Sequence, residues 1–218
     1  MRKRSFYVKR TLDVILTGLL LLLMSYQLTG DLWHEWIGVI MTVLVIVHHI
    51  INIRWYTSLF KGRYTGYRIA VTAVDFLLLI SFALSALSGI SMSAYAVPFL
   101  NGLMSPMTAV KLHLGMSCWS FVLMSLHIGL HLRPVFRGLK ISSRTLLVVR
   151  SVAAVLGVAG LIIFVLENMP TYMLFRQHFA MHSGGPAVLT PLKNILMMMP
   201  WIALGAVTFR RSIGDKEN

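Results

Sequence analysis

Four histidines form two equally spaced pairs within long apolar stretches of the sequence. His34 and His48 lie in one stretch, His113 and His127 lie in another, and the members of each pair are 14 residues apart. On an α-helix, 14 residues turn through about 1400°, which leaves the two side chains about 40° apart and roughly 21 Å apart along the axis. Each helix would therefore present one histidine near each surface of a membrane.

This arrangement predicts a site for two haem groups. If the two helices run in the same direction, His34 faces His113 at the outer surface and His48 faces His127 at the inner surface. Two imidazoles that face each other across a helical bundle can occupy both axial positions of a haem iron. Both groups would be haem b, because the sequence has no Cys-x-x-Cys-His attachment motif. A zinc site would instead need a compact set of ligands.

Two further histidines are possible substitutes for the inner ligands. His49 leaves an angle of about 60° to His34, compared with about 40° for His48, so His48 is the favoured ligand. His131 follows His127 by one helical turn. It could replace His127, or it could contact a haem propionate or a quinone near the inner surface.

Small and basic residues near the histidines could complete the haem sites. Gly38 and Gly115 stand close to the outer ligands, where a bulky ring needs space, although small residues also pack membrane helices together. Arg54 and Arg133 each follow an inner histidine by six residues. A guanidinium group suits a propionate carboxylate, and the alternative role is ordinary cytoplasmic charge.

The elements that must position these residues are membrane-spanning helices. Of the 218 residues, 57% are hydrophobic and 12% are charged, compared with about 25% charged in a typical soluble domain. Backbone groups in lipid have no water partner, so each span must be helical. The sequence predicts an all-α integral membrane bundle. Its six expected spans are Leu12–Leu28, Trp33–Ile53, Ile69–Met92, Ala109–Leu132, Leu146–Leu166 and Leu192–Phe209.

The basic residues predict the orientation of this bundle. They cluster in residues 2–10, 54–68, 133–150 and 210–216, and six crossings place all four clusters on one side. The positive-inside rule makes that side cytoplasmic, together with both termini. The formal net charge of +13 is thus explained by membrane topology, and no nucleic-acid partner is expected. A cleaved signal peptide is the competing interpretation of the N-terminus, but no clear small-x-small cleavage site follows the apolar run.

The first four spans resemble a duplicated two-helix unit. Asp13 and Asp75 occupy similar places in the first and third spans, and the two histidine pairs occupy similar places in the second and fourth. We expect residues 1–140 to form a di-haem core and residues 141–218 to add a C-terminal helix pair. We also expect Asp13 and Asp75 to pair with basic neighbours. A proton path is disfavoured because the spans lack the buried acidic residues usually found beside one.

An aromatic segment at the outer side contains two more histidines. Pro170 at its start and Gly185 near its end suit a short helix that rests on the membrane surface. His178 and His182 are four residues apart and would share a face of that helix. They could bind a metal or contact a redox partner, or they could be ordinary exposed histidines.

Three segments carry a resemblance to a known family. They are LDVILTGLLLLLMSYQLTG, HEWIGVIMTVLVIVHHIINIRW and KLHLGMSCWSFVLMSLHIGLHLRP, within residues 12–134. They resemble the flavinylation-associated cytochrome family of small prokaryotic membrane proteins. The spacing is also similar to that of cytochrome b in quinol-oxidising complexes, in which two helices bind two b haems. The resemblance implies that His34, His48, His113 and His127 are axial ligands. The last two spans lie outside it.

The resemblance implies a role in electron transfer. We expect a di-haem b-type cytochrome in the prokaryotic cytoplasmic (inner) membrane. It would relay electrons between a quinone pool and an extracytoplasmic redox partner, either a flavoprotein or another electron-transfer subunit. It would then be one subunit of an oxidoreductase complex. Two alternatives stay open: a stand-alone quinone-dependent metal or superoxide reductase resembling cytochrome b561, and a haem-free transporter or structural subunit.

Overall fold

The computed structural model describes residues 2–132, 142–180 and 184–214, and it is helical throughout these ranges apart from short connections. No strand occurs among these residues, which confirms the prediction of an all-α protein. Short 3₁₀ turns cover Pro98–Leu100 and Ala187–Leu189. The α-helices are α1 (Arg2–Leu23), α2 (Tyr26–Ile51), α3 (Arg54–Ser58), α4 (Gly66–Ile90), α5 (Pro106–His131), α7 (Ser143–Leu166), α8 (Met169–Met173) and α9 (Thr190–Gly214).

Five stretches of the described chain are long and apolar enough to cross a membrane. They lie within α2, α4, α5 and α7 and within residues 187–206, which include most of the apolar part of α9. Each covers or overlaps a span predicted from hydropathy. At 1.5 Å per residue, the regular part of α2 after Gly30, from Asp31 to Ile51, extends over about 31 Å, which matches the roughly 30 Å hydrocarbon core of a bilayer. The chain is therefore a multi-pass membrane protein.

The first predicted span, Leu12–Leu28, differs from the structure. α1 ends at Leu23, and the remainder of that apolar run belongs to the turn into α2. α1 contains six charged residues, namely Arg2, Lys3, Arg4, Lys9, Arg10 and Asp13. The apolar run is thus divided between two helices, and α1 is not among the five candidate spans.

Local sequence signals explain where the helices begin. Thr65, Ser105 and Ser142 are the N-caps of α4, α5 and α7, and each side chain accepts a hydrogen bond from the backbone N–H three residues later. Such caps satisfy donors that a helix cannot pair internally. Pro106 occupies the first turn of α5, where its missing N–H costs nothing.

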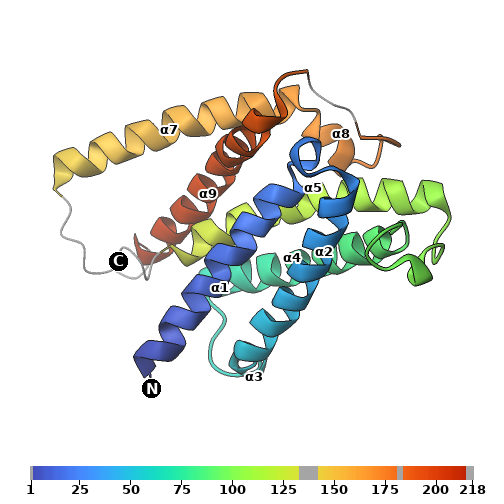
Figure 1. Cartoon of the computed structure of the whole chain (residues 1–218). Helices are drawn as coiled ribbons and strands as arrows, with labels where there is room; N and C mark the ends of the chain where they lie inside the picture. The colour runs from blue at the N-terminus through green and yellow to red at the C-terminus, as the bar shows by residue number, and fades with distance from the viewer. Residues whose placement is uncertain (1, 133–141, 181–183, 215–218) are drawn as a thin grey trace.

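The helices pack chiefly as neighbouring pairs, with α5 at the centre. α1 packs against α2, α4 against α5, and α9 lies between α5 and α7 (Figure 1). α2 meets α4 at only a few positions. α5 contributes more buried residues than any other helix that the structure describes, including the fully buried Phe121. The α1–α2 pair is therefore joined loosely to the rest of the bundle.

Glycines allow α9 to approach its neighbours closely. A Cβ atom at Gly129 would collide with the backbone oxygen of Ile202, and one at Gly205 would lie 2.6 Å from the oxygen of Leu126. On the other side of α9, a Cβ at Gly160 would collide with the oxygen of Leu196. α9 thus packs directly on α5 of the predicted core, and α7 packs on α9.

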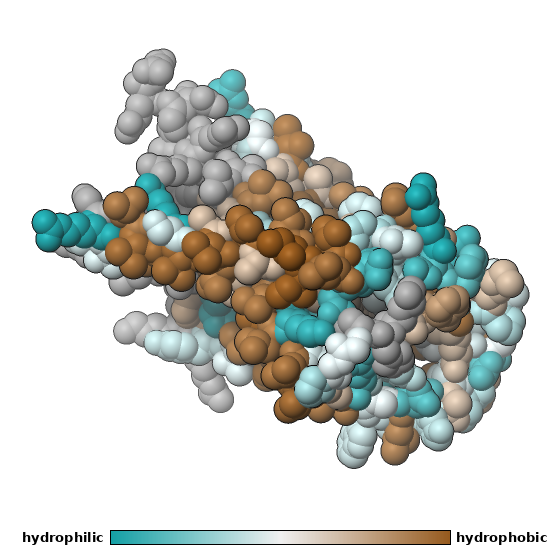
Figure 2. All heavy atoms as spheres, turned by 90° about the horizontal axis from the view of Figure 1, so that it is seen from above, coloured by the Kyte–Doolittle hydropathy of each residue, from teal (hydrophilic) through white to brown (hydrophobic). Residues whose placement is uncertain are grey.

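The surface of the bundle carries a broad apolar face. Figure 2 shows hydrophobic side chains in a continuous patch, with hydrophilic residues toward both ends. Exposed valines, leucines and isoleucines recur along α7, including Val155, Val158 and Leu166, which are 69%, 61% and 70% exposed. A soluble protein rarely exposes such a surface, whereas lipid would cover it at no cost.

Candidate functional site

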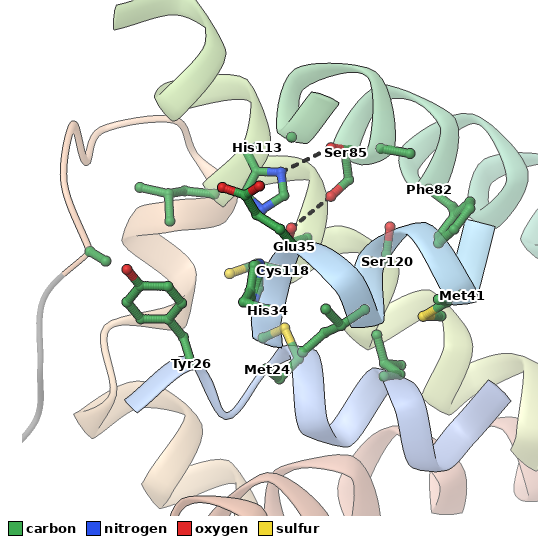
Figure 3. A pocket seen from close by; sticks show the side chains of 18 of the residues that line it. Met24, Tyr26, His34, Glu35, Met41, Phe82, Ser85, His113, Cys118 and Ser120 are labelled. Atoms are coloured by element: carbon green, nitrogen blue, oxygen red, sulfur yellow. Dashed lines mark hydrogen bonds between the residues drawn. The ribbon is translucent and has the colours of Figure 1, made fainter. Parts of the chain in front are cut away.

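A cavity of about 660 Å³ lies between the two halves of the predicted haem-binding core. His34 of α2 and His113 of α5 both line it, and Figure 3 shows them among the side chains around it. Gly38 also lines the cavity, and a Cβ there would meet only Leu23, at 3.9 Å. The volume falls within the range of about 300–1,000 Å³ that is typical of cofactor sites, and the lining is mostly apolar.

The rings of His34 and His113 have the separation that one metal ion between them requires. Their centroids are 6.0 Å apart, and the ring planes make an angle of 78°. A metal–nitrogen bond is about 2 Å long and the nitrogen lies roughly 1 Å from the ring centre, so two imidazoles on opposite sides of one metal stand roughly 6 Å apart. The structure thus brings together the two residues that the spacing predicted for the outer site.

Hydrogen bonding prepares His113 for a ligand role. Its Nδ1 lies 2.9 Å from the backbone oxygen of Ser85, to which it can donate, and its ring packs against Gly89. Metal-binding histidines commonly donate one ring N–H to a carbonyl or carboxylate, which leaves the other nitrogen for the metal. The buried Nδ1 of His34 has no hydrogen-bond partner in the structure. An unsatisfied buried ring nitrogen needs an explanation, and a ligand in the cavity would supply one.

Gly115 does not line this cavity. A Cβ atom at Gly115 would collide with the ring of Phe175, so the space that Gly115 leaves is occupied by that side chain. Phe175 follows α8 and adopts a positive φ of 56°. Trp119 fixes the same segment by donating from Nε1 to the oxygen of Met173 at 3.0 Å. In the structure, Gly115 makes room for Phe175 and not for the cavity where haem was predicted.

The two inner histidines each contact an aspartate through Nδ1. His127 Nδ1 lies 2.7 Å from Asp75 Oδ1, and His48 Nδ1 lies 3.2 Å from Asp13 Oδ1. Asp75 is well buried, with its side chain 13% exposed, and Asp13 is 40% exposed. Arg10 approaches Asp13 only at 4.0 Å. Asp13 therefore has the expected basic neighbour in Arg10, whereas Asp75 contacts His127, and each aspartate lies closer to a predicted haem ligand.

A compact group of potential ligands also forms at the inner end. Asp75, His127 and His131 bring their ligand atoms within 4.8 Å of one another, and His131 Nε2 lies 4.0 Å from Asp75 Oδ1. Two ligands on one tetrahedral metal lie roughly 3.3 Å apart, given metal–ligand bonds of about 2 Å. The 2.7 Å distance between Asp75 and His127 is shorter and indicates a hydrogen bond. This geometry favours Asp75 as the group that orients His127.

His49 has a partner of its own. Its Nδ1 lies 2.9 Å from the hydroxyl of Tyr56, which is on α3. Asn52 instead contacts His48, with Nδ2 donating to the His48 backbone oxygen at 2.9 Å. The adjacent histidines therefore face different environments, and the aspartate contact belongs to His48, the ligand favoured from the spacing.

The remaining predicted site residues lie away from the cavity or outside the described chain. Arg54 is exposed at the start of α3. Arg133 and His182 lie outside the described residues. His178 is exposed and not helical, because α8 ends at Met173. The helix expected between Pro170 and Gly185 is thus much shorter in the structure.

Glu35 is a functional candidate that the sequence interpretation missed. Its carboxylate accepts hydrogen bonds from the backbone N–H groups of Ala94, Tyr95 and Ala96, at 2.8–2.9 Å, and from the hydroxyl of Ser93 at 2.7 Å. These bonds attach the α4–α5 loop to α2 beside His34. The sequence of the loop does not predict this contact, because three of the four donors are backbone N–H groups, which every residue type except proline carries.

Comparison of the chain with protein-family models, curated proteins and solved structures finds no match. The fold and the site define a class all the same: an all-helical, multi-pass membrane protein with histidines facing each other across an internal cavity. The assignment of a function therefore depends on the geometry of that site.

Proposed function

We propose that this protein is a di-haem b-type cytochrome of the prokaryotic cytoplasmic membrane, related in kind to the flavinylation-associated cytochromes that its sequence resembles. The observation that carries the proposal is the 6.0 Å separation of His34 and His113 across an apolar cavity. Haem b would supply one-electron transfer between ferric and ferrous iron. The chain would relay electrons between a quinone pool and an extracytoplasmic redox partner.

The residues of the chain would bind and tune the two groups in different ways. His34 and His113 would hold the outer haem, and His48 and His127 the inner one. Ser85 and the two aspartates, which contact the Nδ1 atoms of these rings, would fix their orientation. Arg54 and Arg133 are the proposed partners of the inner propionates. In this arrangement α1 is a sixth crossing, and both termini are cytoplasmic.

The experiment that tests the proposal is haem quantitation on the purified chain. We expect a reduced-minus-oxidised spectrum of b type and about two haems per chain by the pyridine haemochrome method. His113→Ala and His48→Ala should each remove one haem, because each deletes an axial ligand of a different site. His178→Ala is the matched control and should keep both. A purified chain without haem would refute the cytochrome assignment.

A second candidate function is a haem-free proton or cation transporter. It is favoured by one observation, namely the largely enclosed carboxylate of Asp75 beside His127 and His131. Ionisable groups inside membrane spans often mark ion or proton pathways. Asp75, whose side chain is 13% exposed, is a largely enclosed acidic group of the kind that a proton path needs and that we did not expect. A chain that lacks a haem spectrum but moves protons in vesicles would favour this function.

A further inference from the structure

A second cavity, of about 570 Å³, lies between α2 and α4. Thr42, Phe82, Ala86 and Ile90 line both this cavity and the first one, so the two are neighbours. Its lining on α2 extends from Thr42 to Ile50, which is roughly 12 Å along a helix, and continues through Ile53 to Tyr56 of α3. The cavity is thus an elongated groove, which we call the α2–α4 groove.

The groove is apolar along its length and polar at one end. The described residues that line it include no lysine, arginine, aspartate or glutamate. Besides Thr42, the polar side chains are His49 and Tyr56, which share the 2.9 Å hydrogen bond. Both belong to the end of the groove that is predicted to face the cytoplasm. Because Tyr56 contacts Nδ1, the Nε2 of His49 is the ring nitrogen left for a ligand.

Aromatic packing holds the polar end in place. Trp55 lies between Tyr56 and Phe76 of α4, with ring centroids 4.9 Å and 5.4 Å away. The short helix α3 is thus anchored against α4, and Tyr56 is positioned above His49. The ring of His49 is also 5.6 Å from that of His48, the proposed inner haem ligand. A molecule bound at His49 would therefore lie beside the inner haem site.

We infer that the α2–α4 groove binds a quinone, with its ring at His49 and Tyr56 and its apolar tail along the groove. A quinone is neutral and lipid-soluble, and its ring oxygens accept or donate hydrogen bonds, which are the groups that His49 and Tyr56 offer. A phospholipid head group carries charge, and the groove offers no opposite charge to it. The inference gives the quinone of the proposed function a site, and so it rests on that function.

Equilibrium binding to the full chain tests the site without any redox reaction. The probe is decylubiquinone, titrated by calorimetry into the chain in phosphatidylcholine nanodiscs. Tyr56→Phe and His49→Gln should each weaken binding about five- to tenfold, as expected for one lost hydrogen bond. Tyr64→Phe is the matched control, because the hydroxyl of Tyr64 donates to Leu59 and does not line the groove. Its affinity should equal that of the unaltered chain.

Photo-cross-linking of the unaltered chain keeps the inference testable if a variant fails to fold. An azido derivative of the same quinone should label peptides that contain residues 42–56 or 79–90, and excess decylubiquinone should suppress the labelling. Equal affinities of Tyr56→Phe and Tyr64→Phe would overturn the site. Labelling outside the groove would also overturn the site. The same holds if a lipid acyl chain occupies the groove and decylubiquinone does not displace it.

Haem content, measured in the same preparations, separates the two hypotheses. A chain that carries two haems but fails these binding tests would refute the quinone site and leave the cytochrome proposal standing. A chain that binds decylubiquinone at the groove but contains no haem would refute the cytochrome and support the site alone.

Discussion

The contact between an aspartate and a histidine occurs twice at the inner end of the bundle. Asp75 contacts His127 on the α4–α5 pair, and Asp13 contacts His48 on the α1–α2 pair. In each case the carboxylate lies near Nδ1, and the Nε2 of His48 lies 3.5 Å from Asn52 Nδ2. A carboxylate in this position orients a metal-binding imidazole and increases its basicity. The repetition supports a common role for the two histidines.

The charge on Asp75 should influence the midpoint potential of the inner haem. In the proposed cytochrome, a carboxylate beside His127 stabilises the ferric form, which is the more positive one. Asp75→Asn should therefore raise the midpoint potential of one haem by about 60 mV, which corresponds to a tenfold change for a one-electron couple. Potentiometric titration of the absorption spectrum measures this shift.

Asp13→Asn provides the comparison for Asp75→Asn. It should shift the same inner haem in the same direction, but less, because Asp13 is more exposed and its contact with His48 is longer. Neither variant should change the outer haem, which Ser85 orients through a backbone oxygen. A rise in the outer potential alone would contradict the pairing of ligands that we propose.

Residue spacing predicts some of these contacts and not others. The matched positions of His34 and His113, on helices expected to run in the same direction, predicted that the two rings meet, and the structure places them 6.0 Å apart. Gly38 lines the cavity as expected, whereas Gly115 faces Phe175, which lies 60 positions away in the sequence. Contacts of that kind depend on how distant segments fold together. Spacing within one helix carries no information about them.

At the level of the elements, hydropathy predicts five of the spans because lipid-facing helices need a long apolar surface. It does not show that α1 stops at Leu23, since the apolar run continues through the turn. The structure interrupts regular helix again at Gly30, where φ is 64° and ψ is 177°. Glycine tolerates that conformation, and other residues adopt it at a cost. Hydropathy averaged over a window of residues cannot detect such an interruption of the helix.

Two glycines on α7 make a matched pair for testing helix packing. Gly160→Ala places a methyl group against the backbone oxygen of Leu196, so α7 and α9 must separate. We expect a loss of about 1–3 kcal/mol in stability. Gly157→Ala meets its nearest atom, in Pro200, at an ordinary 3.8 Å and should be neutral or slightly stabilising. Thermal unfolding in detergent compares the two, and equal midpoints would contradict close packing at Gly160.

The Glu35 contact links α2 to the α4–α5 loop, and few other contacts join α2 to α4. Glu35→Gln keeps the shape but replaces one oxygen by an amide that faces backbone N–H donors. We expect a loss of about 2 kcal/mol, in line with hydrogen bonds to a charged group, and faster proteolysis of the loop. Ser93→Ala removes a single donor and should have a smaller effect. A loop that stays equally resistant in Glu35→Gln would show that the contact is dispensable.

For the whole molecule, the arrangement of helix pairs explains where the cavities lie. The α1–α2 pair packs within itself, and the α4–α5 pair does the same, so space is left where the two pairs meet. Both cavities are lined from α2 and α4. α9 supports α5 through Gly129 and Gly205, and its first turns also line the first cavity through Lys193, Asn194 and Met197. α9 therefore stabilises the central helix α5, and both cavities keep α2 as one of their walls.

The number of crossings decides on which side of the membrane the N-terminus lies. If α1 lies on the membrane surface, the chain crosses five times, by α2, α4, α5, α7 and α9. Residues 2–10 then lie in the same compartment as the α4–α5 loop. Six crossings, with α1 beside α2, place all four basic clusters in the cytoplasm. The positive-inside rule favours the second arrangement, because the five lysines and arginines of residues 2–10 would otherwise lie outside.

Cysteine labelling in intact cells distinguishes these arrangements. In a Cys118→Ser background, a membrane-impermeant maleimide should label Ser105→Cys, which precedes α5 on the side that the six-span topology places outside. It should not label Ser58→Cys or Ser5→Cys until the cells are lysed. Ser105 and Ser58 are both exposed in the structure, so protection of Ser58→Cys reflects the membrane and not burial in the protein. Labelling of Ser5→Cys in intact cells would show that α1 does not cross, and the proposed six-span topology would then be wrong.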